Sequence, residues 1–234
     1  MQNSLLTRYR AKIIFVSPEC QRNKFEGYNS CFFGVSLENS NFIRPKLIAS
    51  LEWISNRFPS CCVLIGDSIH RITLESLQDL NPEEAKDKAL LLGQEFFYRE
   101  QSIFSQFDRA CKFKFVFCSE IQQYHDYAQY HESLKNLYKE DILFRTSVRS
   151  FGEKFHKKKQ SQLSLEELER RIEKSSDYFL EEFAIFACLQ RRGYQVMVYP
   201  GSFSTLTEIA EAKHPNALQE LKDLTVVSLQ LKKR

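Results

Sequence analysis

An α/β fold, in which helices cover both faces of a parallel sheet, is the fold class that the sequence predicts. The first observation is five short runs rich in β-branched and aromatic residues, which we expect to be strands at residues 11–16, 31–36, 61–67, 112–118 and 194–199. The second is that these runs are continuously apolar rather than alternating, as strands covered on both faces are. The third is that helical patterns separate them, which is the order of a βαβ series.

Two helical patterns lie between the early strands, and a third follows the fourth strand. Residues 45–58 carry apolar side chains at three- and four-residue spacings. Asn81 is a helix cap followed by Pro82 in the first turn, and this helix is expected to extend to about residue 107. Residues 122–148 are rich in tyrosine and helical in pattern.

A last long helix precedes the final predicted strand. Ser164 and Glu167 form a capping box that opens it, and Gly193 ends it after Arg192. Residues 151–162 have no apolar period, and we expect them to form a basic loop between two helices.

Composition is that of an ordinary globular protein, with 43% hydrophobic and 27% charged residues. A chain of 234 residues is expected to form a single domain over residues 1–234, and we expect a monomer. No run of eighteen apolar residues is present, and the first residues lack the features of a secretory signal. We therefore expect no membrane association and a cytoplasmic location.

The seven cysteines are expected to be reduced and buried. They are odd in number, and no pair has the C-x-x-C spacing of a metal knuckle. Several lie inside strand-like runs, as Cys61 and Cys62 do. Because unpaired cysteine is among the most buried residue types, we expect small core side chains and no metal site.

Positive charge is unevenly distributed, although the formal net charge is only +3. Residues 154–159 read KFHKKK, and Arg145 and Arg149 lie just before them. One such run is ordinarily a solvated surface, but several basic runs together favour a polyanionic partner.

Ser36 is the first candidate for chemistry because it ends the second predicted strand. Ligands of open parallel sheets bind at the carboxyl ends of the strands, and backbone N–H groups there can stabilise an oxyanion. Serine is also a common turn and capping residue, so the segment alone leaves both interpretations open. The surrounding residues do not form G-x-S-x-G, which argues against the nucleophile elbow of an α/β hydrolase.

Tyr178, Glu182 and Tyr199 are further candidates. Tyr178 and Glu182 are four residues apart and share one face of the last predicted helix, where burial would raise their proton affinity. Glu181 is adjacent, and we expect one of the two carboxylates to face solvent. Tyr199 ends the last strand at the same sheet edge as Ser36, where a phenol could relay a proton. An ordinary strand end before a Pro-Gly turn is the alternative.

These motifs, taken in order, resemble those of the cyclodipeptide synthase family. Its Gly-x-Ser-x-x-Asn-Ser-x-Phe run is matched by Gly34, Ser36, Asn39, Ser40 and Phe42. Its Tyr-x-x-x-Glu helix is matched by Tyr178 and Glu182, and its late Tyr-Pro pair by Tyr199 and Pro200. Tyr127 matches an intervening tyrosine of the family, for which we expect a supporting role.

The resemblance implies a fold like the catalytic domain of the tyrosine and tryptophan class I aminoacyl-tRNA synthetases, and synthesis of a cyclic dipeptide from two aminoacyl-tRNAs. Ser36 would receive the first aminoacyl group as an ester in a ping-pong scheme. Tyr178 and Glu182 would hold its ammonium group, and Glu182 would accept its proton. Tyr199 would orient the Ser36 hydroxyl or relay protons, and Asn39 would support this network. No cofactor or metal is expected.

The resemblance also places the substrates. The first aminoacyl pocket would be apolar, would favour a small or medium apolar residue, and would be lined by Phe32, Gly34, Leu64, Cys118, Ile185 and Met197. An arginine-rich helix that binds tRNA in some members corresponds to residues 82–107, which here carry few basic residues. We therefore expect tRNA phosphates to be bound by Arg145, Arg149, Lys154, Lys157, Lys158 and Lys159.

Some features leave alternatives open. Tyr199-Pro200 places the chain with the Tyr-Pro type of the family, although Asn39 belongs to the pattern of the Tyr-His type. A synthetase-like protein that binds tRNA without chemistry would share the fold. A serine hydrolase would need a histidine beside Ser36, and the nearest candidate, His70, is interpreted as a loop residue.

Overall fold

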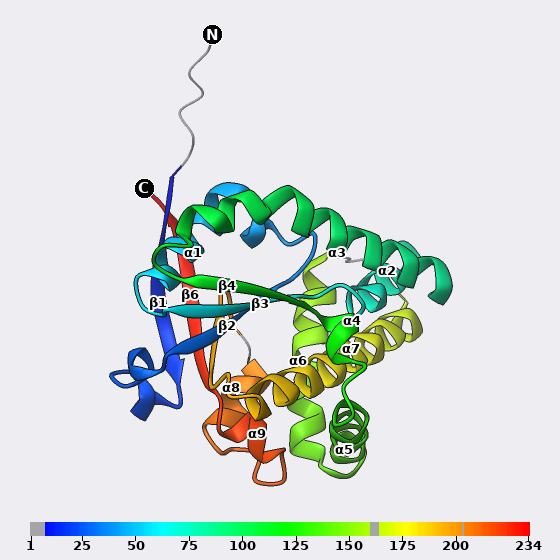
Figure 1. Ribbon diagram of the computed structural model, residues 1–234. Helices are drawn as coiled ribbons and strands as arrows, with labels where there is room; N and C mark the ends of the chain where they lie inside the picture. Colours follow the sequence, from blue (N-terminus) through cyan, green and yellow to red (C-terminus); the bar gives the residue numbers. More distant parts are fainter. Residues whose placement is uncertain (1–7, 160–163, 203) are drawn as a thin grey trace.

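Six strands form one sheet within residues 8–159, 164–202 and 204–234, which are the residues that the computed structural model describes. Their order across the sheet is β1-β6-β5-β2-β3-β4 (Figure 1). Neighbouring strands are parallel except β1, which pairs antiparallel with β6. The bounds are β1 (Tyr9–Ser17), β2 (Ser30–Val35), β3 (Ser60–Ile65), β4 (Lys112–Phe117), β5 (Val196–Tyr199) and β6 (Thr225–Lys233).

The predicted α/β class is confirmed, with one difference at the edge of the sheet. All five predicted strands are present, but the sheet is mixed rather than wholly parallel, because β6 was not predicted and β1 runs against it. The first five residues of β6 are buried, whereas its last four are partly or fully exposed. An apolar run that turns polar halfway does not match the pattern of a strand covered on both faces.

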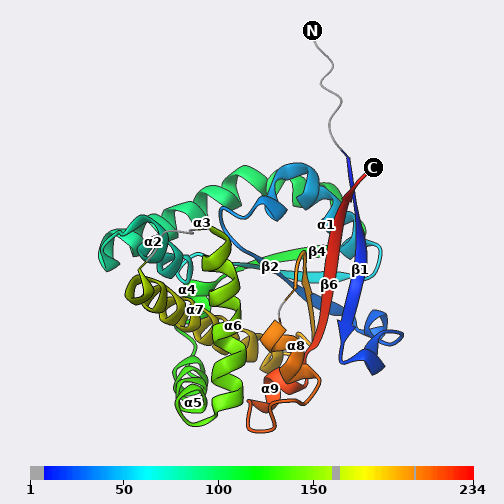
Figure 2. The same ribbon diagram turned by 180° about the vertical axis from the view of Figure 1, so that it is seen from behind.

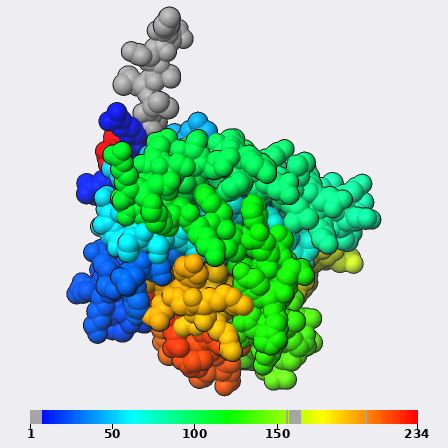
Figure 3. All heavy atoms as spheres, in the orientation of Figure 1, coloured from blue at the N-terminus to red at the C-terminus, as the bar shows by residue number. Residues whose placement is uncertain are grey.

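The helices lie on both faces of the sheet, as predicted. They are α1 (Arg44–Ser55), α2 (His70–Gln78), α3 (Pro82–Phe104), α4 (Cys118–Ile121), α5 (Tyr127–Glu140), α6 (Ile142–Lys159), α7 (Leu165–Arg191), α8 (Ser204–Ala210) and α9 (Gln219–Lys222). Figures 1 and 2 show α1 and α3 over one face and α5, α6 and α7 over the other, and α3 forms much of the outer surface in Figure 3. Strand β2 illustrates the division, since Phe32 joins the α7 core while Cys31 and Phe33 join the α1 core.

The predicted helix ends are confirmed at three positions. The Asn81 side chain accepts a hydrogen bond from the backbone N–H of Glu84 at 3.0 Å. The Ser164 hydroxyl accepts one from the backbone N–H of Glu167 at 3.1 Å. Gly193, at φ +93°, adopts the left-handed conformation that ends α7.

The predicted basic loop at 151–162 is wrong as far as Lys159, because α6 continues through it; residues 160–162 lie outside the described part of the chain. The buried positions of α6 are Phe144, Val148, Gly152 and His156, which recur every four residues. A Cβ atom at Gly152 would lie 3.1 Å from Cβ of Ser175, so this glycine lets α6 approach α7 closely. The periodicity was missed because two of its four positions are not hydrophobic.

Two other helical segments differ from the predictions. Residues 122–148 do not form one helix, since α5 and α6 are separated at Asp141, whose Oδ1 accepts the N–H groups of Leu143 and Phe144 at 2.9 and 3.0 Å. Helix α2 was not predicted, and His70 is its first residue rather than a loop residue.

The strand order creates a topological switch point between β2 and β5. From β2 the chain builds the sheet outward through β3 and β4, and it then returns to place β5 on the other side of β2. The loops that follow β2 and β5 therefore leave the sheet at neighbouring positions. In open α/β sheets this crevice is where ligands bind.

Six of the seven cysteines are buried, as predicted, and Cys20 is exposed. Among the described residues, no group of three His, Cys, Asp or Glu side chains is arranged to hold a metal ion. No helix in the same residues is both long and apolar enough to cross a membrane.

Replacement of Gly93 by Ala is expected to destabilise the fold, although alanine ordinarily favours a helix by about 1 kcal/mol. A Cβ atom at Gly93 of α3 would lie 2.6 Å from Cβ of Asp67, which is buried and holds Ser119 through two hydrogen bonds. We expect urea denaturation to show a net loss of about 1–2 kcal/mol. Gly27→Ala is the control, because nothing lies within 4 Å of the added atom. A Gly93→Ala protein as stable as the wild type would contradict this interpretation.

Candidate active site

Ser36 and Tyr199 meet at the switch point of the sheet. Ser36 directly follows β2, and Tyr199 is the last residue of β5. Ser36 Oγ lies 3.0 Å from the Tyr199 hydroxyl oxygen. Burial raises the pKa of Tyr199 to about 12, while its hydrogen bond with Ser36 acts in the opposite direction. The phenol therefore keeps its proton at neutral pH, and it can both donate to and accept from the serine hydroxyl.

Two asparagines connect the loop after β2 to the loop after β5. Asn39 Nδ2 donates to the Tyr199 hydroxyl at 3.4 Å, and Asn39 Oδ1 accepts the backbone N–H of Asn41 at 2.9 Å. Asn41 Nδ2 donates to the Pro200 carbonyl at 2.6 Å. These contacts hold Tyr199 against Ser36, which is the geometry that a supporting role for Asn39 requires.

The Tyr199 ring also depends on Gly201. A Cβ atom at Gly201 would lie 2.8 Å from Cε1 of Tyr199, so any side chain there would displace the ring. Phe42 packs against the same ring, with centroids 5.9 Å apart.

The two adjacent glutamates of α7 are both buried, at 7% and 6% exposure, so the expectation that one of them faces solvent is wrong. Glu181 turns toward α2, where the guanidinium of Arg71 binds both of its oxygens and Gln122 donates to it at 2.9 Å. Glu182 turns toward Ser36 and Tyr199, with which it lines the same cavity. The pairing of Glu181 with Arg71 settles which carboxyl group reaches the site.

Glu182 has no cation beside it. The Tyr178 hydroxyl donates to its Oε1 at a long 3.5 Å, and its Oε2 has no hydrogen-bond partner among the described residues. Burial raises the pKa of Glu182 to about 8, and burial likewise raises the pKa of Tyr178 well above its usual value. The carboxyl group is therefore largely protonated at neutral pH, and an ammonium group bound beside it would favour its ionised form.

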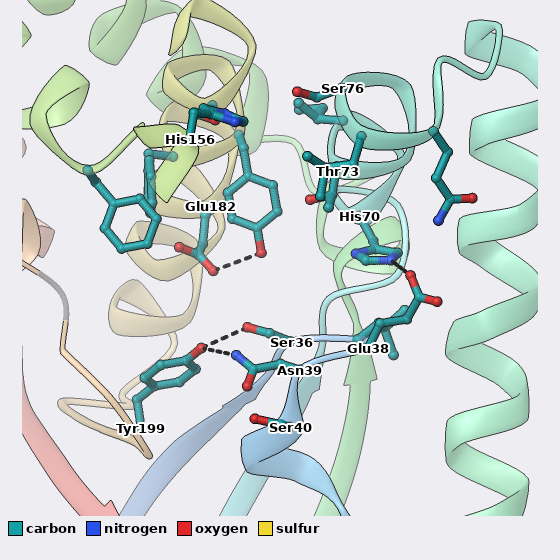
Figure 4. Close-up of a pocket in the computed structure, with 18 of the residues that line it drawn as sticks. Ser36, Glu38, Asn39, Ser40, His70, Thr73, Ser76, His156, Glu182 and Tyr199 are labelled. Atoms are coloured by element: carbon teal, nitrogen blue, oxygen red, sulfur yellow. Dashed lines mark hydrogen bonds and ion pairs between the residues drawn. The ribbon is translucent and has the colours of Figure 1, made fainter. Parts of the chain in front are cut away.

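Two cavities open beside Ser36. The larger has a volume of about 700 Å³ and is bounded by the loop after β2, by α2, α6 and α7, and by Tyr199 (Figure 4). The smaller, of about 10 Å³, lies over the sheet and is bordered by Ser36, Glu182, Phe186 and Tyr199. Both cavities therefore share Ser36, Glu182 and Tyr199.

The predicted first aminoacyl pocket coincides in part with the smaller cavity. Gly34, Leu64 and Cys118 line it, whereas Phe32, Ile185 and Met197 are buried outside its lining. Phe186, which was not predicted, takes a place in the wall and packs against Phe32 with ring centroids 5.4 Å apart. The sequence placed Phe32 on the correct face of the sheet, but it could not show that Phe186 stands in front of it.

Tyr127 is not brought to this site. It lies at the start of α5, where its hydroxyl accepts a hydrogen bond from Gln122 at 3.3 Å, and it borders neither cavity. Through Gln122 it belongs to the Glu181 network. Its predicted supporting role could therefore reach the site only through α7.

Sequence reasoning missed a histidine–carboxylate hydrogen bond in the larger cavity. His70 Nε2 lies 3.0 Å from Oε2 of Glu38, and both residues line the cavity with Ser36. Their positions were available as a signal, because Glu38 follows β2 and His70 follows β3 at the same sheet edge. The interpretation of His70 as a loop residue concealed it.

The predicted tRNA-binding residues differ in their surroundings. Arg149 pairs with Glu169 at 2.7 Å and with Glu173, so its charge is already partnered. Arg145 donates to the carbonyl of Lys139 at 2.9 Å. Lys154 is exposed, while the side chains of Lys157, Lys158 and Lys159 lie outside the described part of the structure.

Comparisons with known proteins find a matching family model and similar folds. The sequence model of the family described as cyclodipeptide synthase matches residues 15–189. A solved cyclodipeptide synthase from Fluoribacter dumoffii has a TM-score of 0.79 at 21% identity, and the match covers 97% of this chain and 100% of that one. A cyclodipeptide synthase from Candidatus Glomeribacter gigasporarum bound to Phe-tRNAPhe has a TM-score of 0.66 at 16% identity, covering 88% of each chain.

The likeness extends to a class I synthetase. Tyrosyl-tRNA synthetase from Archaeoglobus fulgidus, in complex with L-tyrosine, has a TM-score of 0.54 at 15% identity, and the match covers 96% of this chain and 61% of that one. This confirms the predicted resemblance of the fold. A search of curated proteins gives no match.

Replacement of Glu182 by Gln is expected to stabilise the protein at neutral and alkaline pH. Burial raises the pKa of this carboxyl group to about 8 in the folded protein, from an ordinary value of 4.5. Its contribution to folding is therefore complete below pH 4.5 and is lost as pH rises through 8. The gain in the variant should be small at pH 4 and grow to about 4 kcal/mol at pH 8, measured by urea denaturation.

Glu181→Gln is the matched control, since it removes the partner of Arg71 and should destabilise the protein at both pH values. A gain for Glu182→Gln that did not change with pH would contradict the burial of an uncompensated carboxyl group.

Proposed function

This chain belongs to the cyclodipeptide synthase family, and we propose that it joins the aminoacyl groups of two aminoacyl-tRNAs into a cyclic dipeptide through an ester on Ser36. The observation that carries the proposal is the 3.0 Å contact between Ser36 and Tyr199 at the mouth of two cavities that also share a buried Glu182. A nucleophile, a proton carrier and an ammonium-binding carboxyl group are thereby within one site. We propose that residues 1–234 form a single domain that contains this whole site.

In the first step, Ser36 Oγ attacks the ester carbonyl that links the first aminoacyl group to its tRNA. The new Oγ–C bond forms, the bond to the tRNA oxygen breaks, and the serine proton passes through the Tyr199 hydroxyl to the departing tRNA hydroxyl. This relay suits a phenol that keeps its own proton, because it gives up one proton as it takes another. The ester is already activated, so the exchange needs no ATP.

Glu182 and Tyr178 would bind the ammonium group of the first aminoacyl residue. The Oε2 atom of Glu182 is buried without a hydrogen-bond partner among the described residues, and an ammonium group would supply one. The first side chain would then lie beside Gly34, Leu64 and Cys118, where the smaller cavity of about 10 Å³ must widen to admit it. Because the space is narrow and its lining mainly apolar, we propose a small or medium apolar first residue.

In the second step, the amine of the second aminoacyl-tRNA attacks the Ser36 ester and releases the serine. The amine of the first residue then attacks the remaining tRNA ester, which closes the ring and releases the second tRNA. The larger cavity, at about 700 Å³, has room for the second aminoacyl group beside the ester. Proximity within one site supplies the ring closure.

The tRNA would be held through its phosphates near the end of α6. A protein of similar fold was solved with Phe-tRNAPhe bound. In this chain, Phe151 and His156 of α6 line the larger cavity, and the sequence of α6 ends in three lysines. Lys154 is exposed there, whereas Arg149 is paired with two glutamates. We therefore assign the phosphate contacts chiefly to Lys154, Lys157, Lys158 and Lys159.

We further assign the chain to the Tyr-Pro type of the family. The Pro200 carbonyl accepts the Asn41 side chain, so the Tyr-Pro pair is tied to the loop of the nucleophile. Asn39, which belongs to the pattern of the other type, here donates to the Tyr199 hydroxyl. Both features serve the same tyrosine.

The two alternative functions receive less support. The hydroxyl group of Ser36 contacts a tyrosine rather than a histidine, which disfavours a hydrolase that uses a His base. A protein that only bound tRNA would have no need of a protonated carboxyl group buried beside a serine.

Ser36→Ala should abolish formation of the cyclic dipeptide. Purified protein incubated with a mixture of charged tRNAs should give a diketopiperazine detectable by mass spectrometry, and intact-mass analysis should show an aminoacyl adduct on the wild type only. Ser40→Ala is the control, because Ser40 lines the same cavity but is not the residue that contacts Tyr199 through its hydroxyl. Normal turnover by Ser36→Ala would refute the ester mechanism.

The triple replacement of Lys157, Lys158 and Lys159 by Ala should raise KM for aminoacyl-tRNA and flatten its dependence on salt, because about three fewer counterions would be released on binding. The matched control replaces Lys232, Lys233 and Arg234, which removes the same charge from the exposed end of β6. An equal effect of the two triple variants would place the tRNA site elsewhere.

A further inference from the structure

The hydrogen bond between His70 and Glu38 has no part in the steps above, and its geometry is well defined. The His70 side chain is 8% exposed, and its Nε2 atom lies 3.0 Å from a Glu38 carboxylate that is half exposed. Glu38 holds φ at +56°, a left-handed conformation that is uncommon for residues other than glycine. Strain of this kind persists where surrounding contacts enforce it, and it is often found at functional sites.

The pair faces Glu182 across the serine. Figure 4 shows Ser36 at the base of the open space, Glu182 and Tyr199 on one side of it, and His70 with Glu38 on the other. All of these residues line the larger cavity, but the smaller one is bordered by Glu182 and Tyr199 and not by His70 or Glu38. His70 therefore belongs to the space that we assign to the second substrate.

The hydrogen bond fixes which nitrogen of His70 can act as a base. A carboxylate can only accept, so Nε2 carries a proton and donates it to Glu38. In the neutral ring, Nδ1 then has an unshared electron pair. Burial lowers the pKa of His70, Glu38 raises it, and Lys88 of α3 lowers it, while Tyr178 and Glu182 of α7 face it across the cavity. The ring is thus neutral at physiological pH and able to accept a proton.

We propose that His70, oriented by Glu38, is a catalytic base that takes a proton from the α-ammonium group of the second aminoacyl-tRNA. This inference rests on the proposed function. The ammonium group transfers one proton to Nδ1, and the resulting amine attacks the carbonyl of the Ser36 ester. The N–C bond forms, the bond from the carbonyl carbon to Ser36 Oγ breaks, and the second amine proton reaches Oγ through Tyr199. The imidazolium ion later gives its proton to the tRNA oxygen that departs at ring closure. The amine of the first residue loses two protons in that step, one to Glu182 and one to solvent.

Glu182 cannot serve both amines at once. Its carboxyl group adjoins the smaller cavity, where the ammonium group of the first residue would already occupy it. A second substrate in the larger cavity needs a proton acceptor of its own, and among the described residues that line it His70 has a carboxylate partner and a neutral ring.

The test separates the two half-reactions in single-turnover experiments. Acylation is followed by intact mass after one aminoacyl-tRNA is added, and decay of the acyl-enzyme is then followed after the second is added, across a range of pH. For His70→Gln we expect acylation within about twofold of the wild type and a fall of about 10² to 10⁴-fold in the second step. In the wild type, the rate of the second step should rise with pH as His70 loses its proton, and this rise should be absent from the His70→Gln variant.

Glu38→Gln should give a smaller fall, of about tenfold, confined to the same step, and it keeps the test decisive if His70→Gln does not fold. His125→Gln, at an exposed position, is the control and should match the wild type in both steps. Equal losses in acylation and in the second step would show a structural role and overturn the proposal, as would an unchanged second step. A wild-type protein that forms no acyl-enzyme would instead overturn the proposed function itself.

Discussion

The parallel pairing of β5 with β2 is the constraint on which the rest of the site depends. The register sets Phe32 against Met197 and Phe33 against Val198, so Tyr199 arrives beside Gly34, two residues before Ser36. Gly34 presents no side chain there, and a Cβ atom would make only an ordinary contact, 3.7 Å from the Tyr199 ring. A shift of one residue would turn Tyr199 to the opposite face of the sheet. The pairing of β5 with β2 thus sets the position of Tyr199, and the hydrogen bonds of Asn39 and Asn41 adjust it.

Neighbouring glutamates on α7 show how the fold treats two carboxyl groups in opposite ways. Glu181 receives the guanidinium of Arg71, which compensates its burial, whereas Glu182 is at least as deeply buried and has no cation beside it among the described residues. An uncompensated carboxyl group costs stability, and proteins retain such groups chiefly where they perform a task. A ligand that brings positive charge would remove the cost, which is why we propose that Glu182 binds an ammonium group.

The fold could be predicted from the sequence where burial is symmetric, and it could not where burial is partial. Strands β2 and β3 are covered on both faces, so their continuous apolar runs predicted them. Strand β6 is buried only in its first half, and its sequence did not predict it. Helix α6 was shortened because Gly152 and His156 occupy inward positions that a hydrophobic pattern does not count. Ser36 and Tyr199 were found because strand ends share an edge. The Glu38–His70 contact joins residues 32 positions apart in the sequence. It depends on helix α2, whose mixed polar and apolar composition did not predict a helix.

The surroundings of Ser36 are asymmetric, and the chemistry of the two steps gives a reason. Exchange of one ester for another is close to balanced in energy and moves a proton from hydroxyl to hydroxyl, for which a phenol of high pKa is sufficient. Attack by an amine first requires an ammonium group to lose a proton, and a phenol that is already protonated cannot accept it. A base near neutrality is needed for that step, on the side where the second substrate enters. In the mechanism that we propose, the phenol and the imidazole lie on opposite sides of the same serine because they act on nucleophiles that arrive in different protonation states.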